Sequence, residues 1–148
     1  MGENGMVPKE RVVRLLRREP VDRMPCFSGQ GMVTSPGIKS LGLKFPNIHL
    51  TAENMAKSAA TTSTMFGFDA IVIPFDMCVL PEAMGLKISI YENSEDILYP
   101  TIPEKIWNDP DEVVIPSDIF KKGRMPVVEE AIKILLRDYG CLLYTSDA

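Results

Sequence analysis

Asp76 is the residue of this sequence best placed to do chemistry. It follows an uninterrupted apolar run, residues 70–75, which is typical of a strand buried on both faces. In parallel α/β proteins, ligands bind just beyond the carboxyl ends of such strands. Asp is equally common as the N-cap of a helix, and a helix over residues 77–84 would use it in that way. Position alone leaves both roles of Asp76 open.

The loop of small residues at 28–31 is a second candidate for chemistry. Glycines stand on both sides of Gln30, which is a weak signal for phosphate binding, and no lysine follows at the position that a P-loop requires. Ser28 lacks the flanking pattern of a serine hydrolase nucleophile. The loop is therefore interpreted as a turn.

Thiols and imidazole are scarce and widely spaced. His49 is the only histidine, and one imidazole cannot build a zinc site. No CxxC, HxC or HExxH spacing surrounds Cys78, so a buried, inert thiol is predicted there. His49 is predicted to be a loop or capping residue. These residues predict no metal site in this chain.

Local patterns predict the elements that must position these residues. Helices are expected where apolar residues recur at helical spacing between capping signals, over residues 8–18, 35–42, 51–66 and 126–139. In the first of these, Lys9, Arg11, Arg14 and Arg18 are expected to face solvent. Short strands are expected from apolar runs or alternation, over residues 24–27, 69–74, 86–91 and 113–115, with the rest of 92–118 irregular.

Composition narrows the class of protein. The chain has 148 residues, is 45% hydrophobic and carries a net charge of −4, which is an ordinary balance for a folded domain and a poor one for binding nucleic acid. Its longest apolar run is too short to cross a bilayer, and its N-terminus does not resemble a secretory signal. Three widely spaced cysteines argue against a disulfide framework, so a reducing cytoplasm is expected.

Four blocks of sequence, in order and spacing, resemble the uroporphyrinogen decarboxylase superfamily. They are residues 9–25, 67–70, 74–76 and 82–85, and the resemblance extends to about Gly140. The resemblance implies a (β/α)₈ TIM barrel in which Asp76 is an active-site aspartate. A complete barrel needs roughly 250 residues. The chain is therefore expected to be a partial TIM barrel of the α/β class, contributing the N-terminal helices and the first strands only.

The resemblance also favours one branch of the superfamily. True decarboxylases clamp the carboxylates of a porphyrinogen with an arginine-rich loop, and the corresponding loop here, residues 27–32, has no arginine. This loop and residues 53–57 and 74–79 look more like the methylcobamide:coenzyme M methyltransferases. That likeness implies methyl transfer from a corrinoid protein to a small thiol, with Asp76 catalytic and Ser28 and Gln30 contacting the substrate.

The resemblance implies a zinc ion and a protein-bound corrinoid for the parent enzyme. The family's zinc ligands are a His-x-Cys pair and a later cysteine, which this chain lacks, so it is expected to bind no cofactor and to be inactive alone. Residues 1–140 are interpreted as the N-terminal part of the barrel, and 141–148 as a non-native tail. A decarboxylase of porphyrin biosynthesis, and a non-catalytic chain that only docks to a corrinoid protein, remain open as alternatives.

Overall fold

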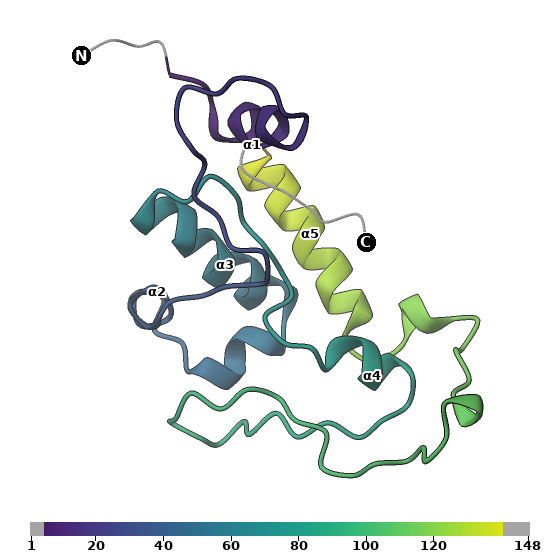
Figure 1. Ribbon diagram of the computed structural model, residues 1–148. Coiled ribbons are helices and arrows are strands. Elements are labelled where there is room, and N and C mark those ends of the chain that lie inside the picture. The colour runs from purple at the N-terminus through teal and green to yellow at the C-terminus, as the bar shows by residue number, and fades with distance from the viewer. Residues whose placement is uncertain (1–4, 141–148) are drawn as a thin grey trace.

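A computed structural model describes residues 5–140, which form a group of helices joined by long irregular segments (Figure 1). The α-helices and 3₁₀ helices follow one another along the chain as α1 (Pro8–Leu16), α2 (Ser35–Ser40), η1 (Phe45–His49), α3 (Ala52–Phe66), α4 (Val79–Ala83), η2 (Pro110–Glu112), η3 (Ile119–Lys121) and α5 (Met125–Tyr139). No helix within the described residues has the length and apolar character needed to span a membrane.

Helix α3 begins and ends at the residues that the sequence predicts. The Thr51 side chain accepts a hydrogen bond from the Asn54 backbone N–H at 3.2 Å, which satisfies one free donor of the first turn. Gly67 ends the helix with φ of 71°, a left-handed conformation that suits glycine. Met55 and Ala59 are buried, whereas Phe66, the last residue of the helix, is 47% exposed.

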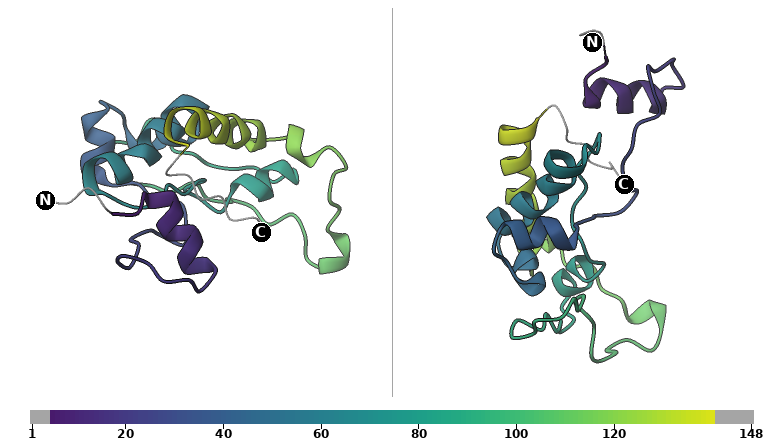
Figure 2. Two further views of the ribbon diagram at one scale, coloured as in Figure 1. Left: turned by 90° about the horizontal axis from the view of Figure 1, so that it is seen from above. Right: turned by 90° about the vertical axis from the view of Figure 1, so that its left-hand side faces the viewer.

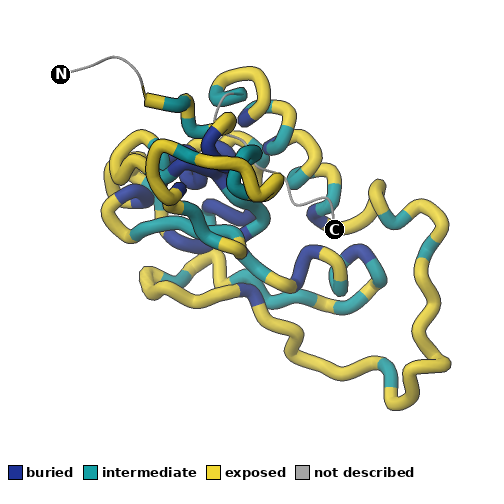
Figure 3. Tube along the Cα trace, turned by 45° about the horizontal axis from the view of Figure 1, so that its top comes forward, coloured by how far each residue is buried: buried dark blue, intermediate teal, exposed yellow. Residues whose placement is uncertain are grey.

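Helices α3 and α5 pack against each other and form the centre of the core (Figure 1). Ala131 and Leu135 of α5 are fully buried and form the inner face of this helix. Small side chains on α3, such as Ala56 and Ala59, allow the two helices to approach closely. Figure 3 shows that burial is concentrated around these helices.

Helix α2 lies against α3 at a glycine. A Cβ atom on Gly37 would lie 2.2 Å from the Oγ1 atom of Thr61, so any larger residue would force the two helices apart. The Thr34 side chain accepts a hydrogen bond from the Gly37 N–H at 3.1 Å and starts the helix. The short helix predicted near residues 35–42 is thereby confirmed.

The predicted strands do not form within residues 5–140. The segment 69–74 is partly buried, with Ala70 and Ile71 in the interior, but it forms no strand: Ile71 alone has a β-bridge, and the Asp69 N–H donates to the Cys26 carbonyl at 2.8 Å. In place of the strand predicted over 86–91 there is one isolated antiparallel bridge, between Ser89 and Thr101. Residues 24–27 and 113–115 are likewise irregular. Apolar pattern predicts burial, but a strand also needs a neighbour with which to exchange backbone hydrogen bonds.

Residues 92–118 are mostly irregular, as predicted, and with residues 84–91 they run around the outside of the molecule (Figure 3). It contains the short helix η2 and a series of exposed apolar side chains, among them Ile102, Ile106, Val114 and Ile115.

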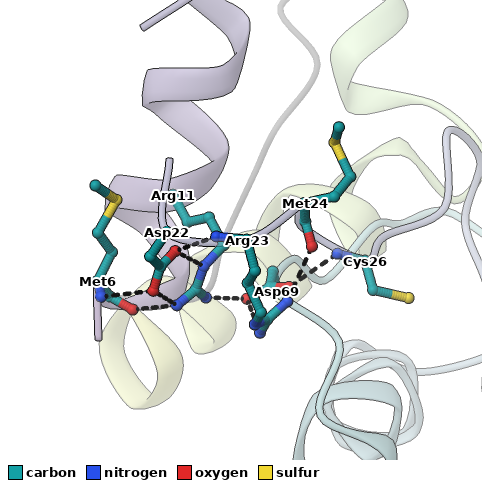
Figure 4. Close-up of polar contacts among 7 residues, drawn as sticks. All are labelled: Met6, Arg11, Asp22, Arg23, Met24, Cys26 and Asp69. Carbon is teal, nitrogen blue, oxygen red and sulfur yellow. Dashed lines mark hydrogen bonds and ion pairs between the residues drawn. The ribbon is translucent and has the colours of Figure 1, made fainter. Parts of the chain in front are cut away.

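An ionic cluster attaches α1 to the rest of the protein. Figure 2 shows this helix at the periphery, where its Lys9 Nζ donates to the Gly140 carbonyl at the end of α5 at 3.5 Å. Asp69, fully buried, accepts hydrogen bonds from Arg11, from both Nη atoms of Arg23 at 2.8 and 2.9 Å, and from the Cys26 N–H at 2.8 Å (Figure 4). Arg11 also donates to Asp22. We call these five residues the Asp69 cluster.

The prediction that Arg11 faces solvent is therefore wrong. Its guanidinium group lies between the carboxylates of Asp22 and Asp69 and is 5% exposed (Figure 4). Burial of Asp69 would raise the pKa of its carboxyl, but the contacts with Arg23, the Cys26 N–H and Arg11 outweigh that effect and lower it. The pKa of Asp22 is also lowered, chiefly by the hydrogen bonds from Arg11.

Candidate functional site

A cavity of about 260 Å³ lies between the 29–31 loop and residues 72–77. The two segments meet at Gly31, where an added Cβ would lie 1.6 Å from the carbonyl oxygen of Pro74. Only glycine permits this approach, because any side chain would overlap backbone atoms that cannot move out of the way. The loop that sequence analysis singled out therefore forms one wall of a pocket, and the segment containing Asp76 forms the other.

The structure brings two of the three predicted site residues to this pocket. Gln30 and Asp76 line it, whereas Ser28 is not among the lining residues. The Ser28 Oγ atom instead accepts a hydrogen bond from the Gln30 N–H at 3.2 Å, which holds the turn of the loop. Ser28 is thus placed to support Gln30, and the substrate contacts predicted for both residues stay predictions.

Asp76 contributes to the pocket in an unexpected way. Its carboxylate is turned into the protein and is only 2% exposed. One oxygen, Oδ1, accepts from the Cys78 N–H at 2.8 Å and from the Arg124 Nη2 at 3.2 Å, and the other, Oδ2, accepts from the Arg124 Nη1 at 2.8 Å. The carboxylate therefore lies behind the pocket wall, and its catalytic role stays a prediction.

Asp76 is not the N-cap of the helix that follows. That helix, α4, has Cys78 at its N-cap position and is shorter than the predicted helix over 77–84. The hydrogen bond from Cys78 N–H to Asp76 Oδ1 closes a local turn before the helix begins. The structure therefore excludes the helix-capping role of Asp76, one of the two roles that its position in the sequence left open.

Arg124, which sequence analysis did not single out, is the main partner of Asp76. It is buried, and besides the two hydrogen bonds to Asp76 it donates from Nε to Glu82 Oε2 at 2.6 Å. One signal was available: Arg124 is the N-cap residue of α5, and a cation is disfavoured at the positive end of a helix dipole. An arginine at such a position indicates a partner elsewhere in the fold.

His49 also belongs to this site. The prediction of a loop or capping residue is wrong: His49 is the last residue of η1, whose C-cap is Leu50, and it is fully buried, with its Nδ1 2.9 Å from Asp76 Oδ2. Within residues 5–140, neither ring nitrogen has a hydrogen-bond partner with good geometry. The rings of Phe45 and Phe75 pack edge-on around it, with centroids 5.3 and 6.1 Å away.

The electrostatics of the site keep Asp76 ionised. Burial alone would raise the pKa of its carboxyl, but the contacts with His49 and Arg124, together with the Cys78 N–H, lower it well below the ordinary range. At neutral pH Asp76 is a hydrogen-bond acceptor and cannot serve as a proton donor. Burial and the neighbouring Asp76 charge raise the pKa of the Cys78 thiol.

The described residues do not fit a zinc site. Cys78 is buried, as predicted, and its Sγ lies 3.2 Å from the Pro100 carbonyl oxygen, to which it donates. Its raised pKa disfavours the thiolate that zinc requires. No group of three or more His, Cys, Asp or Glu side chains within residues 5–140 is arranged to hold a metal ion.

The sequence and the fold can now be compared with those of known proteins. The sequence matches the uroporphyrinogen decarboxylase (URO-D) family over residues 7–141, and the chain belongs to that family.

Among its relatives, the methylcobamide:CoM methyltransferase MtbA of Methanosarcina mazei is 36% identical over 135 residues, which are 90% of this chain and 39% of the relative. A uroporphyrinogen decarboxylase of Chloroherpeton thalassium is 30% identical over 133 residues, covering 87% of this chain and 36% of that protein.

A solved structure agrees with the family assignment. A methyltransferase from Methanosarcina mazei superimposes with a TM-score of 0.81 at 31% identity, covering 91% of this chain and 40% of that one. The chain thus spans about two fifths of the length of these relatives. The predicted tail, residues 141–148, lies outside the described residues.

Proposed function

We propose that this chain forms part of a corrinoid-dependent methyltransferase, which moves a methyl group from a methylated corrinoid protein to a thiol such as coenzyme M. The pocket between residues 29–31 and 72–77 would be one wall of its active site, at the mouth of a TIM barrel to which the chain contributes the first part. The names of relatives such as MtbA support this proposal.

The chemistry of the pocket wall is the observation that carries the choice of reaction. None of the described residues that line it is basic, and the only charged one, Asp76, is already paired with Arg124 behind the wall. A porphyrinogen with several carboxylates requires cationic partners, ideally arginines that bind in a bidentate manner. A wall made of Gln30, glycines, apolar side chains and backbone suits a less charged ligand.

Within this function Asp76 acts as an acceptor rather than an acid. The resemblance allows Asp76 either to position or to protonate a group of the bound cofactor or substrate, and its lowered pKa favours the positioning role. Gln30 offers the side-chain amide that contacts the substrate, and Ser28 fixes the turn that presents it. Zinc is implied by the resemblance alone, and the residues described do not fit it.

The test is a chimera in which this chain replaces the segment that it matches in the Methanosarcina mazei methyltransferase MtbA. We expect the purified chimera to consume coenzyme M when methylcobalamin is supplied, and the 148-residue chain alone to be inactive. Conversion of uroporphyrinogen without loss of free thiol would contradict the proposal and favour the decarboxylase. Binding of a corrinoid protein with neither reaction would favour a docking role.

A matched pair of variants tests the wall itself. Gln30→Ala removes the one side-chain amide that lines the pocket and should raise KM for the thiol or the corrinoid. Gln30→Glu keeps the size but adds a charge, and it should be the more harmful change. Equal activity of both variants and the unaltered chimera would show that the pocket is not the substrate site.

A further inference from the structure

Arg124 contacts Asp76 with a geometry that only arginine can provide. Two of its nitrogen atoms donate to the two carboxylate oxygens, Nη1 to Oδ2 at 2.8 Å and Nη2 to Oδ1 at 3.2 Å. The third, Nε, donates to Glu82 at 2.6 Å, which fixes the plane of the guanidinium group. A planar fork of this kind sets the direction of a carboxylate as well as balancing its charge.

The turn before α5 is shaped to deliver this side chain to the interior. Gly123 has φ of 51°, and a Cβ there would lie 2.9 Å from Glu82 Cγ and 3.1 Å from the Ala83 backbone nitrogen. The turn therefore packs directly on α4. The resulting position of Arg124 is unfavourable in two respects, since it buries a cation and places it at the positive end of α5. The contacts with Asp76 and Glu82 offset both costs.

We propose that Arg124 is a positioning residue for Asp76, which holds the carboxylate in one orientation and thereby fixes the pocket wall. The link to the wall is local: Oδ1, which Arg124 Nη2 contacts, also accepts from the Cys78 N–H, so the carboxylate closes the turn over residues 76–78. Asp76 and Met77 in that turn line the pocket. Glu82 supports Arg124 from the other side. The kinetic part of this inference rests on the proposed function.

A double-mutant cycle in the chimera tests whether Arg124 acts through Asp76. Arg124→Lys keeps the charge and loses the fork, and we expect kcat to fall by roughly 10- to 100-fold, with KM for the thiol changed by less than about twofold, since misplaced groups slow the reaction step. In an Asp76→Asn background the same substitution should change kcat by no more than about twofold. If Arg124→Lys lowers kcat by the same factor in the Asp76→Asn background as in the original chimera, the proposal is overturned.

The control for this cycle comes from the same helix. Arg137 pairs with Asp138 on the surface of α5, and Arg137→Lys should leave kcat and KM unchanged. If Arg124→Lys merely unfolds a fraction of the protein, kcat per folded molecule, measured beside a thermal melt, stays at the original value. That result would reduce Arg124 to a structural ion pair and overturn the proposal.

A second measurement does not depend on enzymatic activity. The titration of Asp76 can be followed by carboxyl ¹³C NMR in the 148-residue chain; the groups that face it are His49, Cys78, Glu82 and Arg124. Arg124→Lys should move this titration to higher pH, and Arg137→Lys should not. An unchanged titration would overturn the positioning role. A shifted titration in a chimera that transfers no methyl group would leave the role standing and reject the proposed function.

Discussion

Asp76 presents its main chain to the pocket and its carboxylate to the interior. The backbone of Asp76 forms part of the pocket wall. Its side chain connects the start of α4 with the start of α5, through hydrogen bonds from the Cys78 N–H and Arg124. Loss of the carboxylate would leave the buried Arg124 short of a partner, and an uncompensated buried charge is costly. Variants of Asp76 must therefore be checked for folding before their activity is interpreted.

Gly31 and Gly29 form a matched pair for testing the contact between the loop and residues 74–75. Gly31→Ala would place a Cβ against the Pro74 carbonyl, so the loop must shift, and we expect the free energy of unfolding to fall by about 1–3 kcal/mol. Gly29→Ala has open space around its Cβ and should cost little. Urea unfolding measures both, and equal midpoints would show that the loop does not lie against Pro74.

The Asp69 cluster makes stability depend on pH in the acid range. The folded pKa of Asp22 lies below the ordinary value of about 3.9, so its contribution is complete above that value and is lost as pH falls toward the folded pKa. We expect Asp22→Asn to lower stability at pH 7 and the difference from the original chain to shrink between about pH 4 and pH 2. Urea unfolding of dilute protein at a series of pH values measures this difference.

Asp138→Asn is the control for that series. Asp138 pairs with Arg137 on the surface, where solvent and salt weaken the interaction, so its effect should be small and should fade on adding salt. A pH-independent difference between Asp22→Asn and the original chain would contradict the assignment of Asp22 to the cluster.

At the scale of elements, the packing of α3 on α5 dominates the core. Leu135 is fully buried, whereas Leu136, the next residue, is half exposed. We expect Leu135→Ala to lower the free energy of unfolding by about 2–5 kcal/mol, through lost contacts and the cavity left behind. Leu136→Ala should change it by less than about 0.5 kcal/mol. Comparable losses in urea unfolding would mean that α5 packs by a different face.

Helices could be predicted here because their signals are local. Thr51 and Gly67 mark the ends of α3 within the sequence itself, and the spacing of Ala131 and Leu135 marks the inner face of α5. Strands could not be predicted in this way, since the run at 69–74 is buried without a neighbour that completes a ladder within residues 5–140.

The residues of the candidate site also differ in whether local sequence could predict them. Asp76 could be predicted from a local pattern, an acid after an apolar run, whereas Gln30 was expected in the site only from the family resemblance, because its own pattern indicates a turn. His49 and Arg124 lie 27 and 48 residues from Asp76 in the sequence, and no local pattern joins them to it. Their partnership depends on the fold, which brings η1 and the start of α5 to the same carboxylate.

At the scale of the whole molecule, the exposed apolar side chains of the outer segment are the main feature. Val114, Ile115 and Phe120 are each largely exposed, and Met77 at the pocket is 87% exposed. Large exposed apolar side chains promote association when they gather into a patch. We expect the chain to self-associate as its concentration rises, as measured by light scattering.

The double variant Val114→Ser and Phe120→Ser should lower the average mass at a given concentration. Lys105→Ser, a polar change in the same segment, is the control and should have no such effect. A monomer of the original chain with a sharp cooperative melt would contradict the prediction.

The way in which α1 is attached limits how the protein can be shortened. Asp69 is buried against cations that come from residues 11 and 23, so the interior depends on a part of the chain that lies at the periphery. In a version that starts after residue 23, the Cys26 N–H would be the one remaining partner of this carboxylate among those described above. The buried, uncompensated charge would destabilise the segment that leads from Asp69 to the pocket. Removal of residues 1–23 would therefore be expected to disturb the pocket wall at residues 72–77, although the removed residues do not line the pocket.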